Sequence, residues 1–131
     1  EFKLLKTEFV PRLHTMCLKT TAAGVRVNSL VALSKVVGRL DKDECEKIVD
    51  TVTKVTTVDK SAGTVTCALG LARAISKQWG AEVTAQRILP LLCPLTVSAQ
   101  SPQNFEALMT AIREMLALIE SKKRLTADTS Q

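Results

Sequence analysis

The stretch 85–124, AQRILPLLCPLTVSAQSPQNFEALMTAIREMLALIESKKR, decides the fold. It predicts two helices joined by a short polar break, in which Ser101 caps the second helix and Pro102 takes its first position. The second helix carries one apolar stripe, formed by Phe105, Leu108, Met109, Ile112, Leu116 and Ile119. Because two helices cannot bury both of their apolar stripes alone, this hairpin needs further hairpins beside it.

The composition is that of one globular domain with an aliphatic core. Of the 131 residues, 46% are hydrophobic, 24% are charged and only 3% are aromatic. These values exclude a disordered tail, and no apolar run reaches the roughly 18 residues that a membrane-spanning helix needs. The chain starts at Glu1 without an initiator methionine, and we interpret it as a segment of a longer protein.

Upstream of the hairpin, the apolar spacing predicts four more helices. Apolar spacing is helical over 2–19, but Pro11 would be costly inside a helix, so we expect the first helix to run over 10–19 with Pro11 in its first turn. The second covers 25–39, the third starts at the capping residue Asp41, and the fourth ends at Gly80. The fifth helix, which is the first helix of the hairpin, starts at Thr84 and should be kinked or divided by Pro90 and Pro94. The polar residues 125–131 are expected to fray.

The third helix is the one whose sequence gives conflicting signals. Its segment 51–58, TVTKVTTV, is rich in β-branched residues, which favour strands. The apolar positions 48, 49, 52 and 55 nevertheless follow a helical period and do not alternate. We therefore predict a helix here.

An internal repeat indicates how the helices are arranged. The segment VRVNSLVALSKVV at 25–37 aligns with GTVTCALGLARAI at 63–75, and the last helix repeats the pattern about 40 residues further on. A period near 40 predicts an all-α solenoid of about three HEAT- or armadillo-like hairpins over residues 1–124, with the helix at 25–39 packed on the fourth helix and the fourth on the last. The residues Leu33, Leu71 and Ile112 should then be buried. The alternative is a compact six-helix bundle in which the repeat is accidental.

No combination of residues in the sequence suits catalysis, a cofactor or a metal. There is no glycine-rich phosphate loop, and no kinase catalytic-loop or DFG motif. The cysteines Cys17, Cys45, Cys67 and Cys93 are far apart and form no CxxC pair, so zinc binding is not expected. His14 is the only histidine, and we interpret it as a partly exposed surface residue.

The charge is concentrated at the N-terminal end. Residues 1–40 hold seven lysines and arginines against two acids. A candidate basic partner face consists of Arg12, Lys19, Arg26, Lys35 and Arg39. Because no aromatic residues are interleaved for base stacking, nucleic acid is not the expected partner, although a basic module that binds RNA stays the alternative function.

One short run loosely resembles a clathrin-binding peptide. It comprises 116–120, LALIE, on the predicted apolar stripe of the last helix. We therefore expect these residues to be buried structure, since a linear motif must be extended and exposed to bind.

Four strings resemble the HEAT-repeat region of the Scy-like pseudokinases. They are FVPRLHTMCLKT (9–20), VRVNSLVALSKVVGRLDK (25–42), RILPLLCPLTV (87–97) and QNFEALMTAIREMLALIESKKR (103–124). The resemblance covers roughly residues 8–124, and its most distinctive parts are VRVNSLVAL and the last string.

The resemblance implies a scaffold role. Proteins of this family have a kinase-like domain before such a segment and a disordered tail after it, and they act in clathrin-dependent traffic between the trans-Golgi network and endosomes. The implied partners are clathrin and adaptor proteins, contacted mainly through the tail, and the implied location is cytoplasmic, peripheral to Golgi, endosome and coated-vesicle membranes. Another branch of the family is linked to transfer RNA handling. Arg26 occupies the place where HEAT repeats often keep an arginine that bonds neighbouring repeats, so the resemblance gives it a structural role.

Overall fold

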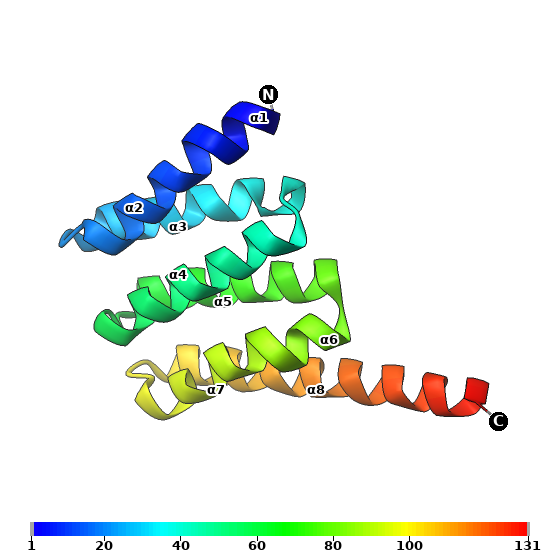
Figure 1. Ribbon diagram of the computed structural model, residues 1–131. Coiled ribbons are helices and arrows are strands. Elements are labelled where there is room, and N and C mark those ends of the chain that lie inside the picture. The colour runs from blue at the N-terminus through cyan, green and yellow to red at the C-terminus, as the bar shows by residue number, and fades with distance from the viewer. Residues whose placement is uncertain (1, 131) are drawn as a thin grey trace.

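The computed structural model describes the backbone of residues 2–130 and the side chains of residues 3–125. Within that part of the chain every regular element is helical and no strand occurs. The helices pair into hairpins that lie one below the other, with the N-terminus at one end of the stack and the last helix at the other (Figure 1).

In the first hairpin, a rod made of α1 (Phe2–Leu4), η1 (Leu5–Phe9) and α2 (Val10–Lys19) pairs with α3 (Ala23–Val36), which ends in the 3₁₀ turn η2 (Val37–Arg39). The second hairpin consists of α4 (Lys42–Val58) and α5 (Ala62–Trp79). In the third, a rod made of α6 (Ala81–Val83), η3 (Thr84–Ile88) and α7 (Leu89–Ser98) pairs with α8 (Pro102–Ser130). The β-branched segment 51–58 is helical, as its periodicity predicted.

The two divided rods share one way of accommodating proline. In η1 the Val10 N–H bonds back to the Leu5 carbonyl, and in η3 the Leu89 N–H bonds back to the Thr84 carbonyl, each five residues away as in a π-helix. Pro11 and Pro90 follow directly, and neither can donate a backbone hydrogen bond. Because the wide turn makes room for the proline, the first rod continues upstream to Phe2. The predicted helix, which began at Val10, was therefore too short.

The predicted helix ends are present in the structure. The Asp41 carboxylate accepts the Glu44 backbone N–H at 2.9 Å, and the Ser101 hydroxyl accepts the Asn104 N–H at 3.3 Å. Gly80 ends α5 with φ of 84°, a conformation that favours glycine. At the C-terminal end, α8 continues as a helix to Ser130, past the boundary at 124 that we expected for the repeat domain. Side chains beyond Leu125 lie outside the described residues.

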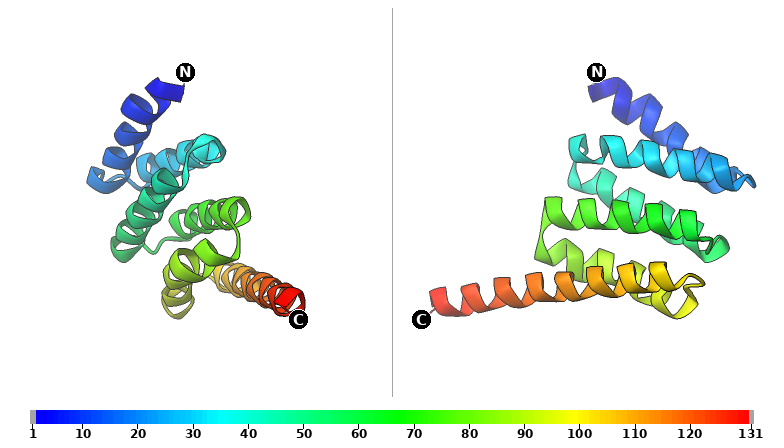
Figure 2. Two further views of the ribbon diagram at one scale, coloured as in Figure 1. Left: turned by 45° about the vertical axis from the view of Figure 1, so that its right-hand side comes forward. Right: turned by 180° about the vertical axis from the view of Figure 1, so that it is seen from behind.

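The helices form two layers. In one layer α3 packs on α5 and α5 packs on α8; in the other α2 packs on α4 and α4 packs on α7. Figure 2 shows the same order from two further directions, with α5 between α3 and α8. The predicted packing of the second helix on the fourth, and of the fourth on the last, is therefore confirmed.

A continuous aliphatic core runs between the layers. Leu33 and Leu71 are fully buried and Ile112 is 8% exposed, as predicted. The predicted stripe on α8 was wrong in part: Leu108 and Ile112 point inward together with Ala111 and Met115, which the stripe had omitted. Phe105 is 41% exposed and Leu116 is 52% exposed. The reason is that α5 and α7 cover only one side of α8, and the largest apolar residues of the stripe lie on the other.

Candidate functional site

A polar cluster joins the first hairpin to the second at the start of α3. The Arg26 guanidinium donates to the Asp59 carboxylate at 2.6 Å, to the Thr20 carbonyl at 2.6 Å and to the Cys17 carbonyl at 3.4 Å. Both charged side chains are nearly buried, at 11% and 10% exposure. Arg26 therefore bonds its own hairpin turn and the turn of the next hairpin at the same time.

Asp59 is held from its other side by the start of α5. It accepts the Ser61 backbone N–H and the Thr64 hydroxyl, both at 2.9 Å. The hydrogen bonds from Ser61, followed by those from Arg26 and Thr64, lower the pKa of Asp59 well below its usual range, although its partial burial acts in the opposite direction. The carboxylate is therefore charged at neutral pH and serves to hold two hairpins together.

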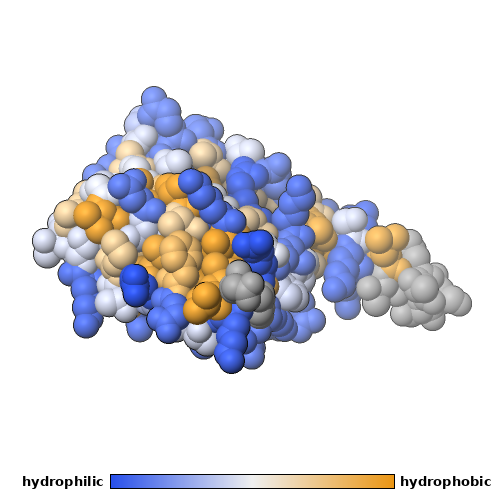
Figure 3. Space-filling view, turned by 90° about the horizontal axis from the view of Figure 1, so that it is seen from above, coloured by the Kyte–Doolittle hydropathy of each residue, from blue (hydrophilic) through white to orange (hydrophobic). Residues whose placement is uncertain are grey.

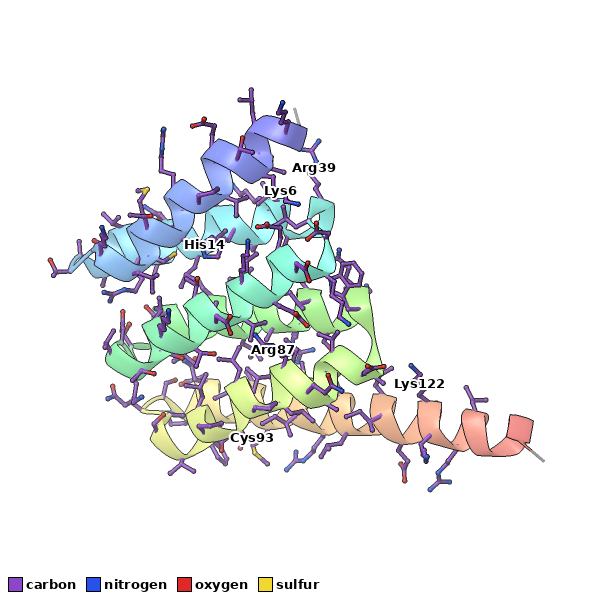
Figure 4. The ribbon with its side chains drawn as sticks, viewed as in Figure 1. Lys6, His14, Arg39, Arg87, Cys93 and Lys122 are labelled. Carbon is purple, nitrogen blue, oxygen red and sulfur yellow. The ribbon has the colours of Figure 1, made fainter. Side chains whose placement is uncertain are left out.

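Further side-chain bonds tie the second hairpin to the third. At the end where α8 begins, the Asn104 amide donates to the Ala62 carbonyl at 3.0 Å. On the other layer, the Arg87 guanidinium pairs with Asp50 at 2.6 Å and donates to the Glu46 carbonyl at 3.3 Å. Figure 4 shows Arg87 between the two hairpins.

The structure does not bring the candidate basic face together. Four of its residues are exposed: Arg12, Lys19, Lys35 and Arg39. Arg26 is nearly buried and forms an ion pair with Asp59. Lys19 and Arg39 lie beyond opposite ends of α3, whose 14 residues span about 21 Å. These residues are spread along the first hairpin and do not form one patch. Figure 3, which looks down on this end of the stack, shows apolar surface between the charged side chains.

The residues most often used in catalysis are not assembled for it. His14 is half-buried on α2, with Nδ1 against the Thr51 hydroxyl, and burial lowers its pKa. Burial raises the pKa of the Cys17 thiol to about 11 and also raises the pKa of Cys45, so both thiols are protonated at neutral pH. Among the described residues no three His, Cys, Asp or Glu side chains are grouped so that they could hold a metal ion.

The clathrin-box-like run was predicted to be buried, and that prediction was wrong. Leu116 is 52% exposed because it lies on the side of α8 that α5 and α7 do not cover, and Leu118 is 40% exposed at the open groove between α5 and α8. The run is nevertheless helical and not extended. A binding groove that needs an extended peptide would have to unwind it first.

A groove lies between α5 and α8. Its volume is about 580 Å³, and Ala74, Ala111 and Met115 form its apolar part. Arg73 lies at its edge and pairs with Glu114 at 2.9 Å, while Lys77 also lines it. Glu114, the carboxylate that lines the groove, is paired with Arg73, and no histidine, cysteine or aspartate lines it.

Comparison with known proteins shows a similarity to SCY1-like protein 2. SCY1-like protein 2 of Mus musculus is 31% identical over 130 residues, which are 95% of this chain and 14% of the relative. SCY1-like protein 2 of Homo sapiens is 30% identical over the same coverage. The chain is homologous to a segment of SCY1-like protein 2. No family model and no solved structure matches.

The relationship confirms the resemblance to the Scy-like family seen in the sequence. The chain spans only 14% of the length of SCY1-like protein 2, so the activity and partners of the whole protein are proposals for this chain. In the described part of the chain, no helix is both long and apolar enough to cross a membrane.

Proposed function

We propose that this chain is a non-catalytic scaffold: an α-solenoid of HEAT-like hairpins inside a Scy-like pseudokinase that takes part in clathrin-dependent traffic between the trans-Golgi network and endosomes. In this proposal the chain holds neighbouring domains and partner proteins at fixed positions. The observation that carries it is the homology to SCY1-like protein 2 over 95% of the chain, together with hairpins that repeat the same packing.

The hairpin-to-hairpin bonds support the solenoid. Arg26 joins the first hairpin to the second, and Asn104 and Arg87 join the second to the third. In a solenoid each repeat contacts mainly its neighbours, and bonds of this kind fix the angle between them. The structural role that the resemblance gave to Arg26 agrees with its contacts.

The non-catalytic assignment rests on what the candidate residues do. His14 contacts a threonine, the charge of Arg26 is engaged in the core, and the thiols of Cys17 and Cys45 are kept protonated. Any kinase chemistry of the parent protein therefore belongs to its kinase-like domain. Peripheral association with Golgi, endosome and coated-vesicle membranes, through clathrin and adaptor proteins, is assigned to the parent protein as a whole.

The test uses the full-length parent protein in cells that lack it. One variant carries Leu71→Asp, which places a charge in the fully buried core, and the matched control carries Lys54→Asp on exposed surface. Both are expressed to equal levels, and the distribution of a receptor that cycles between the trans-Golgi network and endosomes is measured. The core variant should mislocalise the receptor and the control should not. Normal receptor traffic with an unfolded segment would contradict the proposal.

A further inference from the structure

The stripe that the sequence predicted for α8 has a spacing of its own. Its residues Phe105, Met109, Ile112, Leu116 and Ile119 follow intervals of four and three residues, which is the 3.5-residue repeat of a coiled-coil seam. Two of them are uncovered: Phe105 is 41% exposed and Leu116 is 52% exposed. Met109 and Ile119 are partly exposed. Ile112 is only 8% exposed and packs mainly in the core of its own chain, so only its edge reaches this surface. We name these five residues the α8 seam.

The α8 seam faces the open end of the stack. Glu114 and Asn104 contact α5 from α8, so α5 lies on their side of the helix. Leu116 follows Glu114 by two residues and is turned from it by about 200°. On the adjacent α7, Val97 is 90% exposed, and Cys93 is exposed and points away from the other hairpins (Figure 4).

The equivalent side of α5 shows that such a face is built to be covered. Counted 40 residues back, Phe105 corresponds to Val65 and Met109 to Leu69. Val65 is 3% exposed and Leu69 is 7% exposed, on a helix against which α8 packs. On the corresponding surface of α8, Phe105 and Leu116 stay exposed in the described part of the chain.

The charges beside the seam indicate what that helix is. Glu106, Arg113 and Glu120 are seven residues apart, so they lie on one flank of the seam with alternating sign. Glu120 pairs with Arg124 at 2.9 Å, whereas Glu106 and Arg113 form no ion pair in the described part of the chain and are exposed. Such an alternation complements itself when two copies run in opposite directions.

We propose that the α8 seam binds the α8 seam of a second copy of this chain, with the two helices antiparallel and related by a twofold axis. With the axis between positions 110 and 111, Phe105 lies against Leu116 of the second copy and Met109 lies over the exposed edge of Ile112. The same register places Glu106 beside Arg113 of the second copy, and the twofold axis repeats that pair. A parallel pairing fails because Glu106 and Arg113 would then face the flank of Leu108 and Met115, which are buried in the core of their own chain.

The first experiment is sedimentation equilibrium of the 131-residue chain over about 5 to 500 µM. A contact through one face of one helix buries less area than the roughly 800 Å² per partner of a standard interface. We therefore expect a weak dimer, with a dissociation constant of about 10–100 µM. Leu116→Asp should raise this constant at least about tenfold. Leu118→Asp is the matched control, because Leu118 is 40% exposed on the other side of α8, and it should leave the constant within about twofold.

The second experiment exchanges the flanking charges and leaves the apolar residues untouched. Glu106→Arg alone and Arg113→Glu alone should each weaken the dimer about three- to tenfold, since each sets like charges opposite one another. The double variant Glu106→Arg/Arg113→Glu should return the constant to within about twofold of the wild type. Both sites are exposed, so the fold survives, and circular dichroism checks this.

Two results would overturn the proposal. A chain that stays monomeric to about 500 µM would show that another helix, from a partner or from a longer form of the protein, covers the seam. A dimer that the double variant weakens as much as the single variants do would show that the copies meet through a different surface or register.

Discussion

Replacing Arg26 with methionine tests whether the hairpins are fixed to one another by the Arg26–Asp59 cluster. Methionine keeps much of the length and apolar contact of the side chain but removes three hydrogen bonds, those to Asp59, Thr20 and Cys17. It leaves a nearly buried carboxylate without its cation and two carbonyls without a donor. Removing one partner of a buried ion pair costs about 3–5 kcal/mol.

For Arg26→Met, the contacts that Asp59 keeps lower the expected loss of stability below about 5 kcal/mol. Asp59 keeps its bonds to Ser61 and Thr64, and its side chain is 10% exposed, so some solvation remains. We therefore expect Arg26→Met to lower the free energy of unfolding by about 2–4 kcal/mol, which corresponds to a fall in Tm of roughly 10 °C. The double variant Arg26→Met/Asp59→Asn should recover at least about 1 kcal/mol, because the unpaired charge is gone.

The assay is urea unfolding followed by circular dichroism, at pH 7 and then at decreasing pH. The pKa of Asp59 is lowered in the folded chain, so its stabilisation is present above its unfolded pKa of about 3.9 and is lost as pH falls toward the folded value. Arg26→Met should therefore lose less stability between pH 5 and 3 than the wild type does. The control Lys35→Met changes an exposed residue of α3 and should stay within about 0.5 kcal/mol. A loss below about 0.5 kcal/mol for Arg26→Met would refute the reasoning.

Four other outcomes are expected. Truncating any of the core residues Leu33, Leu71 and Ile112 to alanine should cost about 2–5 kcal/mol in urea melts, and losses under about 1 kcal/mol at all of them would show a misassigned core. Gly80→Ala should cost about 1–3 kcal/mol through its positive φ alone, since nothing lies within 4 Å of the added carbon; an unchanged melting curve would mean that the turn readily adopts another conformation. RNA should bind the chain only weakly and non-selectively near physiological salt in filter-binding titrations, whereas a submicromolar, shape-selective complex whose affinity falls steeply with salt would establish the RNA alternative. The isolated chain should not pull down clathrin heavy chain, and capture that is lost in a folded Leu118→Ala variant would disprove this.

Features that depend on near neighbours in the sequence could be predicted. The cap at Asp41 and the glycine stop at Gly80 each require a few adjacent residues, and both are present. The β-branched helix α4 was predictable for the same reason, since its apolar period of about 3.6 residues decides which surface can be buried. The offset of 38 residues between α3 and α5 also predicted their contact.

Features that depend on distant residues could not be predicted in full. The stripe on α8 includes the apolar residues of two faces, and only the positions of α5 and α7 decide which face is covered, so Phe105 and Leu116 were assigned to the wrong one. The partner of Arg26 lies 33 residues away and could not be named from spacing, which is why Arg26 also entered the basic face. Pro11 indicated a helix start because the π-turn that accommodates it has no clear sequence signal.

The polar contacts between hairpins have a consequence for how the chain folds. They join residues separated by 33 to 42 positions, from Arg26–Asp59 to Asn104–Ala62. Each contact therefore closes a loop of about one repeat and joins two neighbouring hairpins. Unfolding should begin at a terminal hairpin and spread one hairpin at a time, so that amide hydrogens of α5, which has a neighbour on both sides, exchange last.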